Sequence, residues 1–540
     1  MSNNVNKRIG WSALIVMSSL IVSRITGFIR EMLVVNCFSD SLLTDGYNYA
    51  FTITDFFYYL LLGGSIASAL IPVMTKHISA GPDQESEGWR GTSAFINVFM
   101  CILLFVCGLG MIFSRQILDL WFPQYAVGSA DPEFYRNTVA SLIRILFPSV
   151  VCMMITGFMN GILNSYKRFA AAAYGPTIYN ICCCLAIFVF RGNIIHVALG
   201  VLASSFTYMC IQIAFTSRHL RNYTFNFDVR HPAFKSLVIL AIPTLLSSAL
   251  NQLNVVVTKT FTQFYDAGAV TALNNANSLW QMPYGIFAAG IGTAMLPSIS
   301  EYFATQKRDM FNETMRSSIR YVMYLVITSA FAFYVLSDQL AASVFLWSNN
   351  VSNTLISDIG ILLKCMSFCM VFQSVIYLCY RAFYASHNTK IPLYSAVINV
   401  LLTTVFGTLI VQLTDWSVVA IGYMYTAASL LTCVITCIMA YTKLGNFGIK
   451  NILVGTGLMC VCSAIMSIAL YGLGKVLTVN ITPALFTLSS KVHDLFNLVL
   501  LVVVGVVVYF TSSALMHIEE ATKVLSTICN KLGIKIHRNS

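Results

Sequence analysis

Charged residues are scarce in this chain of 540 residues: Asp, Glu, Lys and Arg make up 10% of it, whereas hydrophobic residues make up 57%. Soluble domains carry about 25% charged residues, so the composition excludes a soluble globular protein. The strands of a membrane barrel would alternate over about 10 residues, and the apolar runs of this sequence are far longer. The sequence therefore predicts an all-α polytopic membrane protein.

Enzyme motifs are missing as well. The chain contains no GxxxxGK[ST] phosphate-binding loop, no GxSxG nucleophile elbow and no HExxH metal motif. Its eight histidines are scattered, and none lies at metal-ligand spacing from cysteines or carboxylates. Most of the 16 cysteines lie inside apolar runs, where reduced thiols are expected. We therefore expect a transporter rather than an enzyme, without a cofactor; the coupling ion stays open.

Fourteen apolar segments are predicted, beginning near residues 9, 46, 91, 136, 171, 194, 236, 270, 314, 357, 389, 417, 451 and 491. An even number of crossings returns both termini to the same side of the membrane. Lys and Arg concentrate on that side, and the positive-inside rule makes it cytoplasmic. The sequence thus predicts a multi-pass membrane protein with both termini in the cytoplasm. Its net charge of +11 follows from this topology and from contact with anionic lipids, without a nucleic-acid partner.

Two similar motifs, GGSIASALIP at residues 63–72 and AAGIGTAMLP at residues 288–297, are predicted to end the second and eighth segments. They indicate a repeat of six helices, although small residues before a proline also recur by chance in membrane helices. Six is an even number, so the two repeats are parallel, and transporters of this kind bind substrate between their halves. We expect six-helix lobes at residues 1–222 and 223–446, two extra transmembrane helices at 447–516 and a basic cytoplasmic tail at 517–540.

Arg24, Arg30 and Glu31 lie inside the first apolar segment, at residues 9–35, which is long enough to cross a bilayer. Ionisable groups at membrane depth usually face a water-filled cavity and mark a pathway. Arg24, Gly27 and Glu31 share one helix face, and Gly27 leaves room for a close neighbour. The alternative is that both arginines reach a lipid headgroup from one helix end, which suits Arg30 better than Arg24.

Lys259 interrupts the seventh segment, the counterpart of the first segment in the second half. Arg24 and Lys259 are therefore expected to approach one cavity from opposite sides and to form a cationic chamber suited to a phosphate-bearing substrate. The alternative is that Lys259 extends outward to the membrane surface. Asp55 lies early in the second segment.

Five stretches of the sequence together resemble one known family. SRITGFIRE (residues 23–31), followed by TDGYNYAF (44–51), is similar to the SR-x-x-G-x-x-R-[DE] and TDAF patterns of the MurJ (MviN) lipid II flippases. Further similarities to that family are GILNSYKRFAAAAYGPTIYNI (161–181), ALNNANSLWQMPYGIFAAGIGTAMLPSIS (272–300) and YRAFYASHNTKIP (380–392). The matches occur in order along the chain.

The resemblance implies the MOP-type fold (multidrug/oligosaccharidyl-lipid/polysaccharide exporters), in which two six-helix lobes enclose a cationic cavity and two C-terminal helices form a groove for a lipid tail. It implies movement of the undecaprenyl-diphosphate-linked peptidoglycan precursor, lipid II, from the inner to the outer leaflet. The implied partners are this lipid-linked glycan, membrane lipids and other cell-wall synthesis proteins. The implied substrate-binding residues are Arg24, Arg30, Glu31, Asp45 and Lys259.

Several positions depart from the family pattern. Tyr58 and Tyr59 stand where the family commonly has two arginines, and residues 63–64 are Gly-Gly instead of Glu-Gly. Ser278 replaces an arginine, and Thr258 replaces an acid that often precedes the basic residue of the seventh segment. The cavity is expected to hold fewer cations than usual. A flippase for another lipid-linked saccharide, such as a capsule or exopolysaccharide unit, and a small-molecule or drug exporter of the same fold therefore stay open as alternatives.

Overall fold

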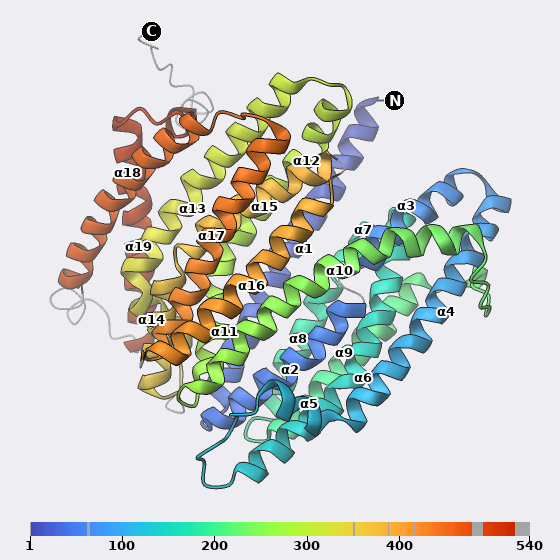
Figure 1. The fold of residues 1–540 in the computed structure, drawn as a ribbon, viewed down its shortest axis with the longest axis horizontal. Coiled ribbons are helices and arrows are strands. Elements are labelled where there is room, and N and C mark those ends of the chain that lie inside the picture. The colour runs from blue at the N-terminus through green and yellow to red at the C-terminus, as the bar shows by residue number, and fades with distance from the viewer. Residues whose placement is uncertain are drawn as a thin grey trace. The chain divides into compact units, whose positions relative to one another are not determined.

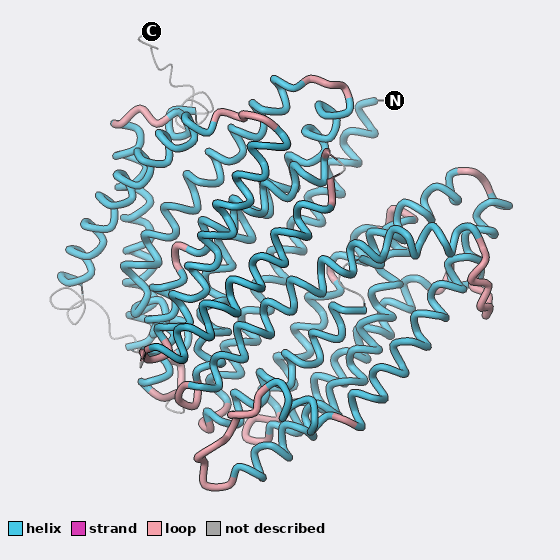
Figure 2. Tube along the Cα trace, in the orientation of Figure 1, coloured by secondary structure: helices cyan, strands magenta, loops and turns pink. Residues whose placement is uncertain are grey.

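The computed structural model describes residues 2–61, 65–348, 351–386, 388–414, 416–477 and 490–523. Within these ranges the regular secondary structure is helical, with short 3-10 and π segments and no strand (Figure 2). The chain forms two compact units, residues 1–271 and residues 272–540. Long helices dominate both units, as the composition predicts (Figure 1).

The first unit is built around α6, which packs against α2, α3, α4, α5 and α9. Its elements are α1 (Ser2–Cys37), α2 (Ser41–Leu61), α3 (Ser65–Ser79), α4 (Pro82–Ile112), α5 (Ser114–Trp121), α6 (Pro132–Ser165), α7 (Phe169–Ala173), α8 (Gly175–Val189), α9 (Ile194–Thr216), η1 (Leu220–Asn222), α10 (Pro232–Thr260) and η2 (Phe261–Phe264). Phe147 and Phe158 of α6 are fully buried, and Phe158 lies edge-to-face with Phe95 of α4. These aromatic contacts form the core of the unit.

Local sequence signals set the ends of several helices. Asp131 precedes α6, and its carboxylate accepts a hydrogen bond from the Phe134 backbone N–H at 3.0 Å. Asn193 caps α9 in the same way, through the backbone N–H groups of Ile195 and His196. Such caps satisfy backbone donors that have no partner inside the helix.

The second unit is built around α13 (Arg308–Phe345), which packs against α12, α14, α15, α18 and α19. Its other elements are η3 (Tyr284–Ala288), α12 (Ala289–Ala304), α14 (Asn353–Met366), α15 (Cys369–Ala385), α16 (Lys390–Leu413), α17 (Val419–Leu444), α18 (Ile449–Val476) and α19 (Ser490–Leu515), while α11 (Ala269–Pro283) begins at the end of the first unit. Arg320 of α13 binds the carboxylate of Glu520 through Nε at 2.7 Å and Nη2 at 3.1 Å, which ties the segment after α19 to α13.

Each of the fourteen predicted segments coincides with one helix or with two consecutive helices. By length and apolar composition, 11 helices of the described residues qualify as membrane spans, or 12 if the bent pair α14 and α15 is one span. The protein is therefore a multi-pass membrane protein, while the count of fourteen is not confirmed. Neither α1 nor the α2–α3 pair qualifies, and α2 carries several buried polar side chains such as Thr44, Asp45 and Asn48.

The prediction that the two proline motifs end their segments was wrong. Pro72 lies inside α3, which continues to Ser79, and Pro297 lies inside α12, which continues to Ala304. Proline is tolerated inside membrane helices because neighbouring groups satisfy the freed carbonyl. The predicted lobe boundary at residue 222 stays a prediction; α10, which follows it, packs against α2, α3 and α4 within the first unit.

Candidate functional site

Arg30 and Glu31 of α1 form an ion pair, with Nη2 of Arg30 at 2.8 Å from Oε1 of Glu31, and both side chains are about three-quarters buried. Arg30 also donates a long hydrogen bond of 3.5 Å to the side-chain oxygen of Asn180 on α8. The Asn180 amide in turn donates to the Ser23 carbonyl at 3.2 Å. A Cβ atom at Gly27 would lie 3.3 Å from the Asn180 nitrogen, so the expectation that Gly27 admits a close neighbour is confirmed.

Lys259 is held inside the first unit. Its ammonium donates a hydrogen bond of 2.9 Å to the hydroxyl of Thr52 on α2. Asp55 lies one turn further along α2, and its carboxylate is attracted by Lys259 and Arg30 and repelled by Glu31. The Lys259 side chain therefore reaches toward α2. This direction favours the predicted chamber over the alternative, in which Lys259 extends to the membrane surface.

Arg30, Glu31, Asp55 and Lys259 thus form one charged cluster, to which α1, α2 and α10 contribute. Its two cations and two carboxylates sum to a formal charge of zero. The sequence predicted a cationic chamber, because Asp55 was placed in the second segment but not in the site. Thr52 binds Lys259, and Asp55 follows Thr52 by three residues. This spacing places Asp55 in the site only when α2 and α10 are known to be neighbours.

Arg24 differs from these four residues. It is exposed, and within the described part of the chain it makes no hydrogen bond or ion pair that meets the usual distance limits. Its guanidinium and the Asp55 carboxylate both act electrostatically on the Tyr59 hydroxyl. Arg24 therefore borders the charged cluster and supplies a positive charge that no carboxylate neutralises by direct contact.

Asp45 does not join the charged cluster. Its side chain is 4% exposed and accepts three hydrogen bonds, from the Gly268 N–H at 2.7 Å, the Thr271 N–H at 3.1 Å and the Thr271 hydroxyl at 2.6 Å. These donors belong to the start of α11, so Asp45 caps that helix from α2 and complements its dipole. The geometry favours a structural role for a residue that the resemblance places in the substrate site.

One face of α2 binds the segment that joins α10 to α11. Besides Asp45 and Thr52, this face presents Asn48, whose amide donates to the Thr271 hydroxyl at 2.9 Å, and Tyr49, whose hydroxyl lies 2.7 Å from that of Thr262. The four residues follow helical i, i+3, i+4, i+7 spacing, and we call them the α2 polar face. Sequence reasoning missed this face because its partners lie more than 200 residues away.

The departures from the family pattern introduce no new charge. Tyr58 and Tyr59 form an edge-to-face pair with centroids 5.1 Å apart. The hydroxyl of Ser278 donates to the Asn274 carbonyl of its own helix at 3.0 Å, and that of Thr258 donates within α10 at 2.8 Å. Residues 63–64 lie outside the described residues. Within the described ranges no group of three or more His, Cys, Asp or Glu side chains could hold a metal ion.

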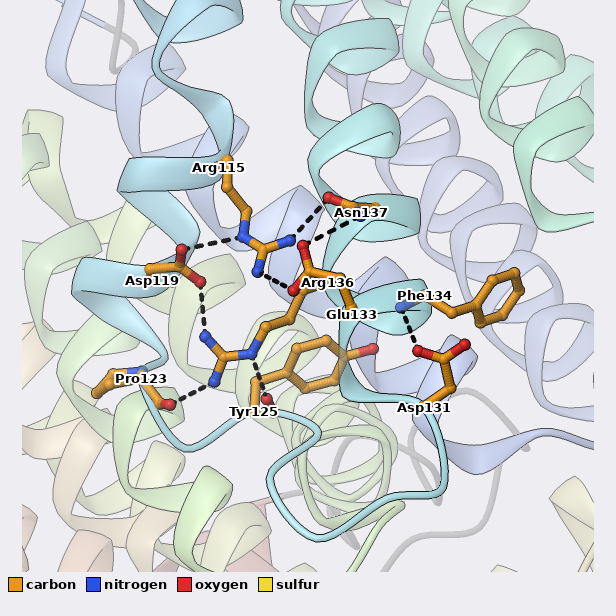
Figure 3. Close-up of polar contacts among 9 residues, drawn as sticks. All are labelled: Arg115, Asp119, Pro123, Tyr125, Asp131, Glu133, Phe134, Arg136 and Asn137. Atoms are coloured by element: carbon orange, nitrogen blue, oxygen red, sulfur yellow. Dashed lines mark hydrogen bonds and ion pairs between the residues drawn. The ribbon is translucent and has the colours of Figure 1, made fainter.

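A second ionic network lies where α4 gives way to α5. Arg115 contacts Asp119 and Glu133, both at 2.9 Å, and Arg136 contacts Asp119 at 2.6 Å (Figure 3). Arg136 also donates to the Tyr125 carbonyl at 3.0 Å. All of its carboxylates are paired, so this network fixes the loop between α5 and α6 and offers no free group to a ligand.

The chain is similar in sequence to known proteins of one family. Residues 34–492 match the family model described as lipid II flippase MurJ; this range includes Asp55 and Lys259 and begins just after Glu31. The chain is 26% identical over 384 residues to the probable lipid II flippase MurJ of Rhizobium tropici, which covers 69% of this chain and 70% of that protein.

Two solved structures show the same fold. A structure of lipid II flippase MurJ in an inward closed conformation has a TM-score of 0.76 and 21% identity, and the match covers 93% of this chain and 99% of that one. An inward-facing multidrug resistance MATE family transporter of the MOP superfamily has a TM-score of 0.66 and 10% identity, with 80% of this chain and 98% of that one covered. The MOP-type fold predicted from the sequence is thereby confirmed.

Proposed function

Since this chain belongs to the MurJ lipid II flippase family, we propose that it moves lipid II from the cytoplasmic to the periplasmic leaflet of the bacterial inner membrane. The observation that carries this proposal is the charged cluster, which brings ionisable side chains of α1, α2 and α10 together. A diphosphate headgroup cannot cross about 30 Å of hydrocarbon unaided. Paired charges inside a membrane protein provide a polar path for such a group.

The proposed roles follow from the chemistry of each side chain. Arg24 and Arg30 present planar guanidinium groups that can bind phosphate oxygens in pairs, whereas Lys259 acts as a point charge. In the absence of substrate Glu31 pairs with Arg30, and the charge of Asp55 attracts Lys259. The diphosphate then replaces the carboxylates as their partner, so substrate binding exchanges one set of charge contacts for another. No covalent step is required.

The orientation and the partners are part of the same proposal. Both termini lie in the cytoplasm, in line with the distribution of Lys and Arg. Alternating access of two lobes moves the headgroup, while the polyprenyl tail stays in lipid. The transported precursor is consumed by other cell-wall synthesis proteins, which we propose as functional partners.

Complementation tests the proposal. Cells depleted of their own lipid II flippase are supplied with this chain in trans, and wall synthesis and growth are followed. We expect rescue by the wild-type chain, and no rescue by an Arg30→Ala, Lys259→Ala double variant present in the membrane at the same level. Failure of the wild-type chain to rescue, despite normal membrane levels, would overturn the proposal.

A second candidate, a flippase for another lipid-linked saccharide, is favoured by one observation: Tyr58, Tyr59 and Ser278 leave three usual cation positions uncharged. Such a protein would use the same charged cluster for the diphosphate and different contacts for the sugars. In the complementation experiment it would fail to restore wall synthesis, and it would restore surface polysaccharide in a strain that lacks the corresponding exporter.

A further inference from the structure

The loop between α9 and α10 presents an apolar edge to its surroundings. From Tyr223 to Val229 the residues alternate between polar and apolar, and Phe225, Phe227 and Val229 are 79%, 47% and 48% exposed. The rings of Phe225 and Phe227 lie edge-to-face, with centroids 5.3 Å apart. We call residues 223–229 the strap.

The polar residues of the strap fix it to α4. The Thr224 N–H donates to the Ser93 hydroxyl at 3.1 Å. The Asn226 carbonyl accepts from the Asn97 amide at 2.8 Å, and the Asn226 amide donates to the Arg90 carbonyl at 3.2 Å. The Tyr223 hydroxyl also donates to the side chain of Asn97, whereas Phe225 and Phe227, which alternate with the anchored residues, remain exposed. The anchoring of Thr224 and Asn226 thus holds the strap on α4 while Phe225 and Phe227 stay exposed.

These anchor points lie at the depth where α4 becomes apolar. Residues 82–94 of α4 are mostly polar, whereas residues 95–112 carry no charge and include exposed apolar side chains such as Leu104 and Phe105. At about 1.5 Å per residue, this apolar run nearly spans a hydrocarbon core of about 30 Å. Ser93 and Asn97 flank its beginning, so the strap lies level with the membrane–water interface, where amphipathic and aromatic groups are enriched.

The same loop is positively charged. Arg218, Arg221 and Arg230 are exposed, while Asp228 is paired with Arg90 at 3.4 Å. His219 stacks on Tyr166, and burial together with the nearby charge of Arg168 lowers the pKa of its imidazole. The surroundings of the strap therefore favour negative groups.

We propose that the strap inserts Phe225, Phe227 and Val229 into the leaflet that borders the start of α4, and that Arg218, Arg221 and Arg230 bind the headgroups of anionic lipids there. An apolar edge at interfacial depth, flanked by cations, matches a lipid surface in both position and charge. A soluble protein partner would need to compete with lipid for this edge. The inference concerns the anchoring of the α9–α10 loop and does not depend on which glycan is transported.

Tryptophan quenching tests the insertion. The full chain with Phe225→Trp is reconstituted into vesicles of phosphatidylcholine and phosphatidylglycerol, with or without bromine on the acyl chains, and wild-type fluorescence is subtracted. Gln84→Trp, at an exposed position in the polar start of α4, is the matched control. We expect strong quenching at position 225 and little at position 84, and the same for Phe227→Trp. Equal quenching at positions 84, 225 and 227 would overturn the insertion.

Lipid preference tests the role of the arginines. Retention of phosphatidylglycerol over phosphatidylcholine is measured by native mass spectrometry for the variant Arg218→Gln, Arg221→Gln, Arg230→Gln. The control removes three exposed cations elsewhere, with Lys76→Gln, Lys307→Gln and Arg308→Gln. Each arginine near an anionic surface is expected to contribute about fivefold to anionic lipid retention. If retention of phosphatidylglycerol falls equally in both variants, or falls in neither, specific headgroup binding by this loop is contradicted.

Discussion

Arg24 stands apart from the other charged residues of α1 because no carboxylate neutralises it by direct contact. Arg30 and Lys259 must release Glu31 and the field of Asp55 before they can hold a diphosphate, whereas Arg24 can engage the substrate at once. At the scale of single residues, the cations of the site are therefore unequal, and we propose that Arg24 makes the first contact with the substrate.

We predict that Arg24→Ala abolishes complementation while membrane level and thermal stability stay unchanged. Arg24→Lys should restore it partly, because an ammonium keeps the charge but lacks the planar fork. Growth of the depleted strain is the measurement, and Arg191→Ala, at an exposed turn between α8 and α9, is the control expected to behave like wild type. Normal growth with Arg24→Ala would mean that the cation-binding mechanism is wrong and that Arg24 only contacts lipid.

Substitution of Asp55 is expected to change substrate binding in the opposite direction from substitution of Arg24. Replacing it with Asn leaves the charged cluster with a net positive charge, so the headgroup should bind more tightly and leave more slowly. We predict a lower Kd for lipid II, measured with the purified protein in nanodiscs, together with slower flipping in vesicles. Asp83→Asn, an exposed acid in the first turn of α4, should change neither quantity. Weaker binding by Asp55→Asn would show that this carboxylate helps to bind the headgroup itself.

At the scale of elements, α2 holds the end of α10 and the start of α11 through its polar face. Asp45 is the residue of this face that accepts most of the bonds. Its two carboxylate oxygens satisfy backbone donors of Gly268 and Thr271 that no residue of α11 could satisfy.

We predict that Asp45→Ala lowers the free energy of unfolding by about 2 kcal/mol, since it leaves buried donors without a partner. Thermal unfolding in detergent is the measurement, and flipping per folded molecule should stay close to wild type. Asn48→Ala, which removes one neutral hydrogen bond from the same face, should cost less. If Asp45→Ala unfolds normally but does not flip lipid, Asp45 acts on the substrate, as the family resemblance implies.

The helices could be predicted from the sequence because hydropathy is a local property: the segments placed near residues 136 and 194 begin in the structure at Pro132 and Ile194. The helix breaks could not, because Pro72 and Pro297 stop a helix only if no neighbour compensates for the missing bond. Arg30, Glu31 and Lys259 were identified as site residues from their cost at membrane depth. The bond of Lys259 to Thr52 beside Asp55, and the cap formed by Asp45, depend on which helices are neighbours, and a single sequence does not contain that information.

At the scale of the whole molecule, the proposed topology places both termini and the strap on the cytoplasmic side. We predict that fusion of a fluorescent protein that matures only in the cytoplasm after residue 540 gives bright cells, and that fusion of alkaline phosphatase there is inactive. The same two reporters fused after Gly192, in the turn between α8 and α9, should give the reverse pattern. An active phosphatase at the C-terminus would overturn the cytoplasmic placement of that terminus.

In the mechanism that we propose, the zero net charge of the charged cluster makes the transport cycle electrically asymmetric. A whole elementary charge that crosses the membrane field gains or loses about 2.3 kcal/mol per 100 mV. When the empty carrier resets, Arg30 and Lys259 move together with Glu31 and Asp55, so these four residues contribute no gating charge. Voltage then acts on the reset through Arg24 and on the loaded step through the bound diphosphate as well. The two halves of the cycle therefore respond differently to voltage, and transient currents on a supported bilayer should differ in size with and without substrate.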